Sequence, residues 1–191
     1  MEEFEIKFLE VDVPRLEKKL LAIGAEKVGE YKYAIILLDY PDRRLNNSHA
    51  WVRLRTDGRE TTLAYKQRLG VQSHDASVSD EGMKEIEVKV DSYEKTFELF
   101  KSIGLVTKRE EKRSRTRYKK NDVVYDIDFW PFIPPYVEIE STSLEKALEA
   151  GRELGFDTKD HLVCSAAQIY RRYGMNKDEY SSITPEGMIK K

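Results

Sequence analysis

Four pairs of carboxylates separated by one apolar residue are candidates for a shared site. Side chains at this spacing share one face of a β-strand, and carboxylate oxygens are the hard ligands that Mg²⁺ and Mn²⁺ prefer. The pairs are Glu3 and Glu5, Glu85 and Glu87, Asp126 and Asp128, and Glu138 and Glu140. We therefore expect some of these pairs to bind a divalent metal.

Lysines and arginines occupy alternating positions of the same kind. Both side chains bind phosphate, and an arginine fork binds two oxygens at once. The basic run 113–117 ordinarily indicates a surface stripe or a nucleic-acid patch, but its alternation beside a carboxylate-bearing segment favours phosphate binding inside the protein. The candidate phosphate ligands are Lys7, Arg53, Arg55, Lys66, Lys89, Arg113 and Arg115.

The period of two around these residues predicts strands with one charged and one apolar face. For a single strand, the ordinary interpretation is that the apolar face meets the core and the charges meet water. Because the pattern recurs in several strands, we favour a closed antiparallel barrel with helices packed on its apolar outside and charges lining its lumen. The first and last strands are neighbours in a closed barrel, so their glutamates are expected to meet at one metal.

A strand with two glutamates followed by a helix occurs three times, which indicates related βα units around a common centre. The first helix is expected to follow Asp12 and to end at Gly24. In the second unit, Asp91 and Glu94 form a possible capping box. The residues expected on the inward face of that second helix are Phe97, Phe100 and Ile103.

The remaining segments are assigned by their turn and breaker residues. Residues 26–40 predict a long strand that is buried on both sides, and Asp57-Gly58 predicts a hairpin turn. Residues 41–49 and residues 69–82, which include His74, are expected to be loops. A last helix is expected over residues 160–174.

The composition limits the classes of protein to which the chain can belong. Its 191 residues suit one domain, and 36 % charged residues with a net charge of only −2 argue against a general nucleic-acid surface. The lone Cys164 cannot form an internal disulfide, which fits a reducing compartment. The chain has no long apolar segment. We expect a cytoplasmic protein with no membrane or nucleic-acid partner, as a monomer or homodimer.

The segment EFEIKF at residues 3–8 resembles the ExExK signature of the CYTH superfamily, the triphosphate tunnel metalloenzymes. The resemblance covers residues 1–175 and leaves 176–191 as a polar C-terminal tail. It implies an α+β fold built on a closed eight-stranded antiparallel tunnel that binds a triphosphate and Mg²⁺ or Mn²⁺. The implied metal ligands are Glu3, Glu5, Glu138, Glu140 and either Asp126 or Asp128, of which we take Asp126.

The same resemblance distributes the remaining roles and implies an enzyme. It assigns phosphate binding to Lys7, to Arg53 and Arg55, to Lys66 and to part of the 113–117 run. Glu85 and Glu87 match the central acidic strand of the family, and we expect them to orient these cations. The residues expected to act in catalysis are Glu3, Glu5 and Lys7.

Three functions remain open from the sequence. The leading one is metal-dependent hydrolysis of inorganic triphosphate or of an organic one such as thiamine triphosphate or a nucleoside triphosphate. The second is a class IV adenylyl cyclase, which converts ATP to cyclic AMP and pyrophosphate; no residue establishes an adenine pocket. The third is a non-catalytic polyphosphate- or nucleotide-binding module, which would gain little from so many carboxylates.

Overall fold

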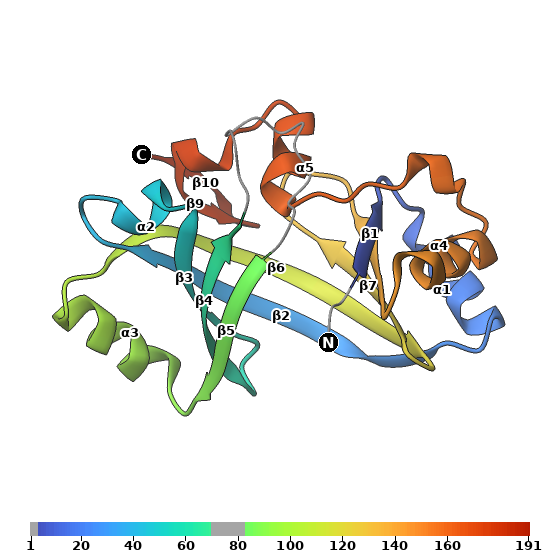
Figure 1. Ribbon diagram of the computed structural model, residues 1–191, viewed down its shortest axis with the longest axis horizontal. Coiled ribbons are helices and arrows are strands. Elements are labelled where there is room, and N and C mark those ends of the chain that lie inside the picture. The colour runs from blue at the N-terminus through green and yellow to red at the C-terminus, as the bar shows by residue number, and fades with distance from the viewer. Residues whose placement is uncertain (1–3, 70–82) are drawn as a thin grey trace. The chain divides into compact units, whose positions relative to one another are not determined.

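The computed structural model describes residues 4–69 and 83–191 (Figure 1). Glu3 and the expected loop with His74 lie outside the described residues, except for Leu69. The helices are α1 Val13–Ala22, α2 Arg44–Asn47, α3 Tyr93–Ser102, α4 Leu144–Glu153 and α5 Ala166–Arg172. The strands are β1 Phe4–Phe8, β2 Glu26–Asp39, β3 Ala50–Thr56, β4 Thr61–Arg68, β5 Met83–Val90, β6 Val106–Lys120, β7 Val123–Phe129, β8 Tyr136–Ser141, β9 Tyr180–Thr184 and β10 Gly187–Lys190.

The ten strands form one sheet, which is open. Its main path runs β1-β8-β7-β6-β2-β3-β4-β5, and β9 and β10 branch from β6. Among the described residues no pairing joins β1 to β5, so the expected closed eight-stranded barrel is wrong, although the α+β class holds. The alternation of charged and apolar residues determines which side chains share a face, but it does not determine whether the two edges of a sheet meet.

The chain divides into two compact units, which we describe separately. Unit 1 comprises Met1–Tyr31 and Ser114–Ile169, and unit 2 comprises Lys32–Arg113 and Tyr170–Lys191. The long strands β2 and β6 contribute residues to both units.

In unit 1, helices cover the apolar face of β1, β7 and β8. Ile6, Ile127 and Ile139 are fully buried in one core with Leu16 and Leu20 of α1. Helix α4 contacts all three strands (Figure 1). The Asp12 carboxylate accepts a hydrogen bond from the Arg15 N–H and caps α1 as predicted. The charged residues between these apolar positions therefore lie on the opposite face of the strands.

In unit 2, the predicted turn at Asp57-Gly58 joins β3 to β4, and α3 covers a second apolar core. The Phe97 and Phe100 side chains pack against this core. Two predictions for α3 are wrong. Ser92, and not Asp91, caps the helix by accepting a hydrogen bond from the Lys95 N–H, and Ile103 is 58 % exposed.

Two further predictions fail because side chains and strand edges compete for backbone groups. The expected loop 41–49 contains the short helix α2, whose Leu45 and Asn46 N–H groups donate to the Asp39 carboxylate at 3.1 and 3.0 Å. The expected helix 160–174 is reduced to α5, which begins at Ala166. The earlier residues cannot join it because the Leu162 backbone forms a β-bridge with Lys7.

The segment 176–191 forms a hairpin of β9 and β10, and β9 lies parallel to β6 (Figure 1). Three buried charges anchor it: Glu111 of β6 accepts hydrogen bonds from Arg109 at 2.6 Å and from Lys177 at 2.8 Å. Arg109 also donates to the Lys177 carbonyl at 2.9 Å. This segment is therefore part of the fold of unit 2.

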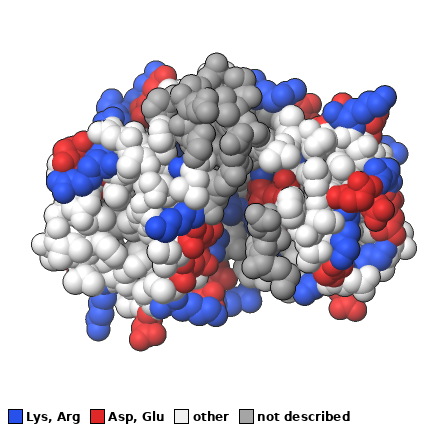
Figure 2. All heavy atoms as spheres, viewed as in Figure 1, with Lys and Arg blue, Asp and Glu red and all other residues white. Residues whose placement is uncertain are grey.

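Two features concern the expected partners: the distribution of charge on the surface, and the length and apolar character of the helices. On the face drawn in Figure 2, lysines and arginines are interspersed with aspartates and glutamates, in line with the small net charge of −2. Within the described part of the chain, no helix combines the length and the apolar character needed to span a membrane.

Candidate functional site

Four neighbouring strands of unit 1 present charged side chains on one face. Glu5 of β1 lies opposite Glu140 of β8, and Lys7 lies opposite Glu138. Asp126 of β7 is the next partner of Glu138. We name this set the acid cluster; its members are Glu5, Lys7, Arg115, Arg117, Asp126, Asp128, Glu138 and Glu140.

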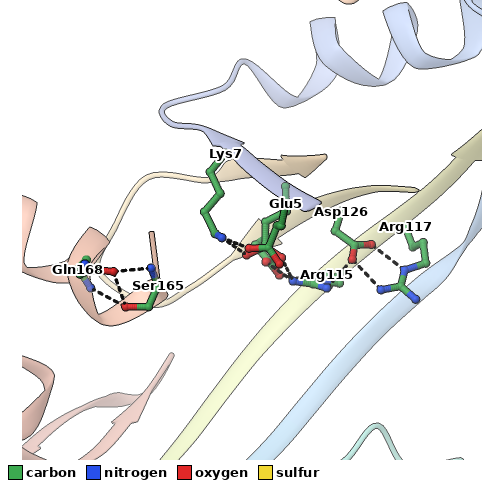
Figure 3. A network of polar contacts seen from close by, with 9 residues as sticks. Glu5, Lys7, Arg115, Arg117, Asp126, Ser165 and Gln168 are labelled. Atoms are coloured by element: carbon green, nitrogen blue, oxygen red, sulfur yellow. Dashed lines mark hydrogen bonds and ion pairs between the residues drawn. The ribbon is translucent and has the colours of Figure 1, made fainter. Parts of the chain in front are cut away.

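Arg115 lies at the centre of the acid cluster (Figure 3). Its Nε and Nη2 bind the two oxygens of Asp128, its Nη1 binds Asp126, and its Nη2 also binds Glu138. Burial alone lowers the pKa of the Arg115 guanidinium, but the charges of Asp128, Glu138 and Asp126 outweigh burial and raise it. Arg115 is therefore held as a permanent cation whose donors are used by carboxylates.

The other two cations of the acid cluster bind its two ends. Arg117 donates from Nε and Nη2 to both oxygens of Asp126, at 2.7 and 2.6 Å. Lys7 is only 3 % exposed and forms ion pairs with Glu5 and, at 3.5 Å, with Glu138 (Figure 3). The Glu5 side chain is 42 % exposed, whereas those of Asp126 and Asp128 are at most 2 % exposed. Glu5 is thus far more accessible than either aspartate.

The acid cluster has the chemistry of a divalent-metal site but not a complete set of converging ligands. Its five carboxylates and three cations leave a formal excess of two negative charges. Among the described residues, no three Asp, Glu, His or Cys side chains come together as a metal-binding group. Mg²⁺ commonly binds through one or two carboxylates, with water and substrate phosphate completing the shell. The donor set therefore fits a metal that enters with an anionic substrate.

Unit 2 carries a second charged face, on β3, β4 and β5. Arg55 lies opposite Thr62, Arg53 opposite Ala64, and Trp51 opposite Lys66. Glu87 is the next partner of Ala64, and Glu85 is the next partner of Lys66. We name the cation cluster after its four basic members; it comprises Arg53, Arg55, Lys66 and Arg113 with the acids Glu85 and Glu87.

The two glutamates of the cation cluster bind its cations directly. Arg53 Nη2 donates to Glu87 at 2.8 Å and to Glu85 at 3.3 Å. Lys66 Nζ forms an ion pair with Glu85 at 2.7 Å, and Arg55 approaches Glu87 at 3.7 Å. These distances are those that a cation-orienting role for Glu85 and Glu87 requires.

Positive charge is nonetheless in excess in the cation cluster. Burial and the charge of Arg53 lower the pKa of Lys66, and Glu85 and Glu87 do not fully offset them. Burial, Arg53 and Arg113 likewise lower the pKa of Arg55. A bound anion would relieve this repulsion, so the electrostatics favour phosphate.

Buried polar atoms in and beside the cation cluster have no hydrogen-bond partner among the described residues. They include Nε of Arg53 and Oγ1 of the neighbouring Thr62, and the Thr62 residue is only 5 % exposed. By contrast, the side chain of the predicted phosphate ligand Lys89 is 76 % exposed and forms an ion pair with Glu60, which is not a member of the cation cluster.

The sequence reasoning missed several residues of these faces. Arg117 belongs to the basic run but was not selected as a site residue. Thr62 and Tyr33 were not considered because neither is charged. Tyr33 lies within cation–π distance of Arg55 and Arg113, at 5.1 and 4.8 Å from ring centroid to guanidinium carbon. For Thr62 the signal is positional, since it continues the alternation that leads to Lys66 on β4. Tyr33 shares its face of β2 with Tyr31 and Ile35, so no sequence signal marks it.

The comparison with protein families identifies the scaffold of both faces. The model of the CYTH domain matches residues 1–173. The chain belongs to the CYTH family. The resemblance inferred from the ExExK pattern is thereby confirmed. No curated protein matches the chain.

Solved structures share the CYTH fold at low sequence identity. The PH1012 protein from Pyrococcus horikoshii OT3 is 22 % identical with a TM-score of 0.67, covering 86 % of this chain and 96 % of that one. A candidate adenylate cyclase from Vibrio parahaemolyticus is 13 % identical with a TM-score of 0.71 and coverage of 88 and 97 %. A candidate adenylyl cyclase from Hippeastrum, described as having a dominant triphosphatase activity, is 15 % identical with a TM-score of 0.62 and coverage of 90 and 95 %.

Proposed function

We propose that this CYTH protein is a divalent-metal-dependent triphosphatase. The observation that carries the proposal is the pairing of β1 with β8, which places Glu5 opposite Glu140 and Lys7 opposite Glu138. Carboxylates distant in sequence are adjacent on one face, with a formal excess of two negative charges in their cluster. A non-catalytic phosphate-binding module would have no use for this acidic face, because acids repel a phosphate.

The metal is assigned to the glutamates of the acid cluster, which are more exposed than its two aspartates. Glu5, Glu138 and Glu140 would hold Mg²⁺ or Mn²⁺, with Glu3 as the further ligand that the family resemblance implies. When bound, such an ion neutralises phosphate charge and activates the attacking nucleophile. Asp126, which we expected as a ligand, and Asp128 are almost fully buried and are bound by arginine through both carboxylate oxygens, so in our proposal they orient Arg115 and Arg117.

The phosphate chain is assigned to cations that are only partly neutralised. Arg53, Arg55 and Lys66 would bind phosphate oxygens, and Glu85 and Glu87 would orient them. Arg115, which we expected as a phosphate ligand, has its N–H groups directed at three carboxylates and would act on those carboxylates instead. Lys7 would orient Glu5 and Glu138 through its two ion pairs.

Hydrolysis is preferred over cyclisation because the charged side chains of both clusters are suited to phosphate and metal, and none of them is an evident reader of a base edge. Binding energy should then come mainly from the triphosphate, and selection at its other end should be loose. The cyclase remains the second candidate, because proteins named as candidate adenylate cyclases share this fold.

The test is a substrate panel with product identification. Inorganic triphosphate, thiamine triphosphate and ATP are each incubated with Mg²⁺ or Mn²⁺, and orthophosphate, pyrophosphate and cyclic AMP are measured separately. We expect metal-dependent orthophosphate release with the matching diphosphate. Stoichiometric pyrophosphate and cyclic AMP from ATP, with inorganic triphosphate untouched, would assign the chain to the cyclases, and binding without turnover of any substrate would support a binding module.

A further inference from the structure

Tyr33 of β2 lies on the strand between two arginine-bearing strands. The strand order places β2 between β6 and β3. Ile35 lies opposite Arg55, and Leu37 lies opposite Arg53, so the alternation puts Tyr33 on the face of β2 that continues the cation cluster. From that position its ring reaches the guanidinium carbon of Arg55 at 5.1 Å and that of Arg113 at 4.8 Å.

The two arginines repel each other, and an aromatic ring can offset this repulsion without accepting a hydrogen bond from their N–H edges. Burial and Arg53 are the larger causes that lower the pKa of Arg55, and Arg113 lowers it further, whereas the charge of Glu87 raises it. Glu87 is 3.7 Å from Arg55, which is longer than a hydrogen bond. The electron-rich face of the Tyr33 ring attracts both guanidinium groups and offsets part of their repulsion.

The way in which an arginine is held decides what it can still bind. A guanidinium that stacks on an aromatic ring uses its flat face, and its N–H groups lie in the plane of the guanidinium. In the acid cluster, Arg115 is held edge-on by Asp126, Asp128 and Glu138, so its N–H groups are directed at carboxylates. Contact with the Tyr33 ring therefore suits an arginine whose donors serve a ligand.

We propose that Tyr33 is a positioning residue for phosphate binding: its ring contacts both Arg55 and Arg113 and holds their guanidinium groups so that their N–H edges can receive the oxygens of a triphosphate. The inference rests on the proposed function. It assigns to an uncharged residue part of the selectivity for a chain of phosphates over a single phosphate, because two guanidinium groups held together can bind two phosphate groups at once.

The test compares the removal of the ring with the removal of its hydroxyl alone. KM and kcat for inorganic triphosphate are measured for wild type, Tyr33→Phe and Tyr33→Leu, with thermal unfolding of each. We expect Tyr33→Phe to stay within about twofold of wild type, because the ring remains. Tyr33→Leu should raise KM about tenfold, and lower kcat less than about threefold.

A matched control uses another tyrosine that stacks with an arginine. Arg44 lies 4.3 Å from the centroid of the Tyr40 ring, and neither residue belongs to the cation cluster. Tyr40→Leu should leave KM unchanged. An unchanged KM in Tyr33→Leu, or an equal rise in Tyr40→Leu, overturns the inference. An equal loss in Tyr33→Phe also overturns it, because the hydroxyl and not the ring would then be responsible.

A second readout does not depend on triphosphate turnover. The Nε–H signals of Arg55 and Arg113 are observed by NMR in the ligand-free protein and during titration with inorganic pyrophosphate. In wild type and in Tyr33→Phe, we expect both signals to be sharp and to shift together during the titration. In Tyr33→Leu, we expect them to broaden or to shift independently of each other. If wild type turns over no triphosphate, the proposed function fails, and these signals still decide whether Tyr33 positions the two arginines; independent signals in wild type would overturn the inference.

Discussion

The acid cluster of unit 1 and the cation cluster of unit 2 are built on the same alternation but carry opposite excess charge. Five carboxylates surround three cations in the acid cluster, whereas four cations accompany two glutamates in the cation cluster. The pKa of Arg115 is accordingly raised despite its burial, and burial lowers the pKa values of Arg55 and Lys66 with help from Arg53. Arg115 therefore completes a network of acids, whereas Arg53 and Arg55 are the arginines to which we assign an anion in our proposal.

The largest expected effect is on stability, and it separates these two uses. Arg115→Met should lower the free energy of unfolding by about 3–5 kcal/mol, because it leaves three carboxylates without their common cation. Arg53→Met should lower the free energy of unfolding by less than about 1 kcal/mol. After this substitution Glu85 still has Lys66, and Glu87 still has Arg55, as a neighbouring cation. Urea denaturation of both variants measures the difference. Equal losses would mean that the contrast between the clusters is not energetic.

The next largest expected effect is a loss of stability at low pH. It arises from a carboxylate that is buried among cations in unit 2. Burial raises the pKa of Glu111, but Lys177 and Arg109 outweigh burial and lower it to about 2 from an ordinary value of 4.5. Because the folded-state pKa is depressed, the stabilisation is fully present above pH 4.5 and is lost as the pH falls through about 2. Its size should be roughly 3 kcal/mol, from 1.36 kcal/mol per unit.

The measurement for this acid effect is the free energy of unfolding between pH 5 and 2, in wild type and in Glu111→Gln. The variant cannot gain a proton at this position, so its curve should fall less steeply over that range. Parallel curves for the two proteins would assign the acid sensitivity to other carboxylates.

Substitutions in the two clusters should change different kinetic constants. Glu5→Gln removes ligand charge from a side chain that is 42 % exposed, so it should lower metal-dependent kcat on the order of a hundredfold while the fold persists. Lys66→Met should instead raise KM about tenfold for every triphosphate, because it removes a phosphate contact shared by all of them. Steady-state kinetics at several Mn²⁺ concentrations check both. A Glu5 variant with wild-type activity would remove Glu5 from the metal site.

The sequence predicted the members of each face better than it predicted the interactions among them. Alternation around Glu5, Glu85 and Glu138 correctly placed these acids opposite an apolar face, and β1 does pair with β8, the last in sequence of the eight strands on the main path. Closure of the barrel could not be deduced, because ion pairs such as Arg115 with Asp128 satisfy the charges of an open sheet equally well. The pattern does not record sheet curvature.

Contacts that depend on the register of three or more strands were also beyond the sequence. Arg115 was expected to bind phosphate, and its three carboxylate partners come from β7 and β8, whose alignment is fixed only in the fold. Tyr33 stood in an apolar run, and its role depends on β2 lying between β6 and β3. Ser92 replaced Asp91 as a helix cap because both residue types can cap, and their positions differ by one.

The smallest effect should distinguish the two sides of one strand in the cation cluster. Thr61 and Thr62 of β4 are both buried, but the Thr61 hydroxyl donates to Thr56 Oγ1 at 3.1 Å, whereas the Thr62 hydroxyl has no partner among the described residues. Replacing an unpartnered buried hydroxyl with a methyl group of the same shape removes an uncompensated desolvation penalty. Thr62→Val should therefore raise the free energy of unfolding by about 1 kcal/mol, and Thr61→Val should lower it by about 1 kcal/mol. Thermal and urea unfolding in the absence of phosphate measure both changes.

A bound triphosphate that accepts a hydrogen bond from Thr62 would give this hydroxyl a partner. The gain in stability of Thr62→Val should therefore disappear when inorganic triphosphate is present. A gain that is independent of triphosphate would place Thr62 outside the phosphate-binding face.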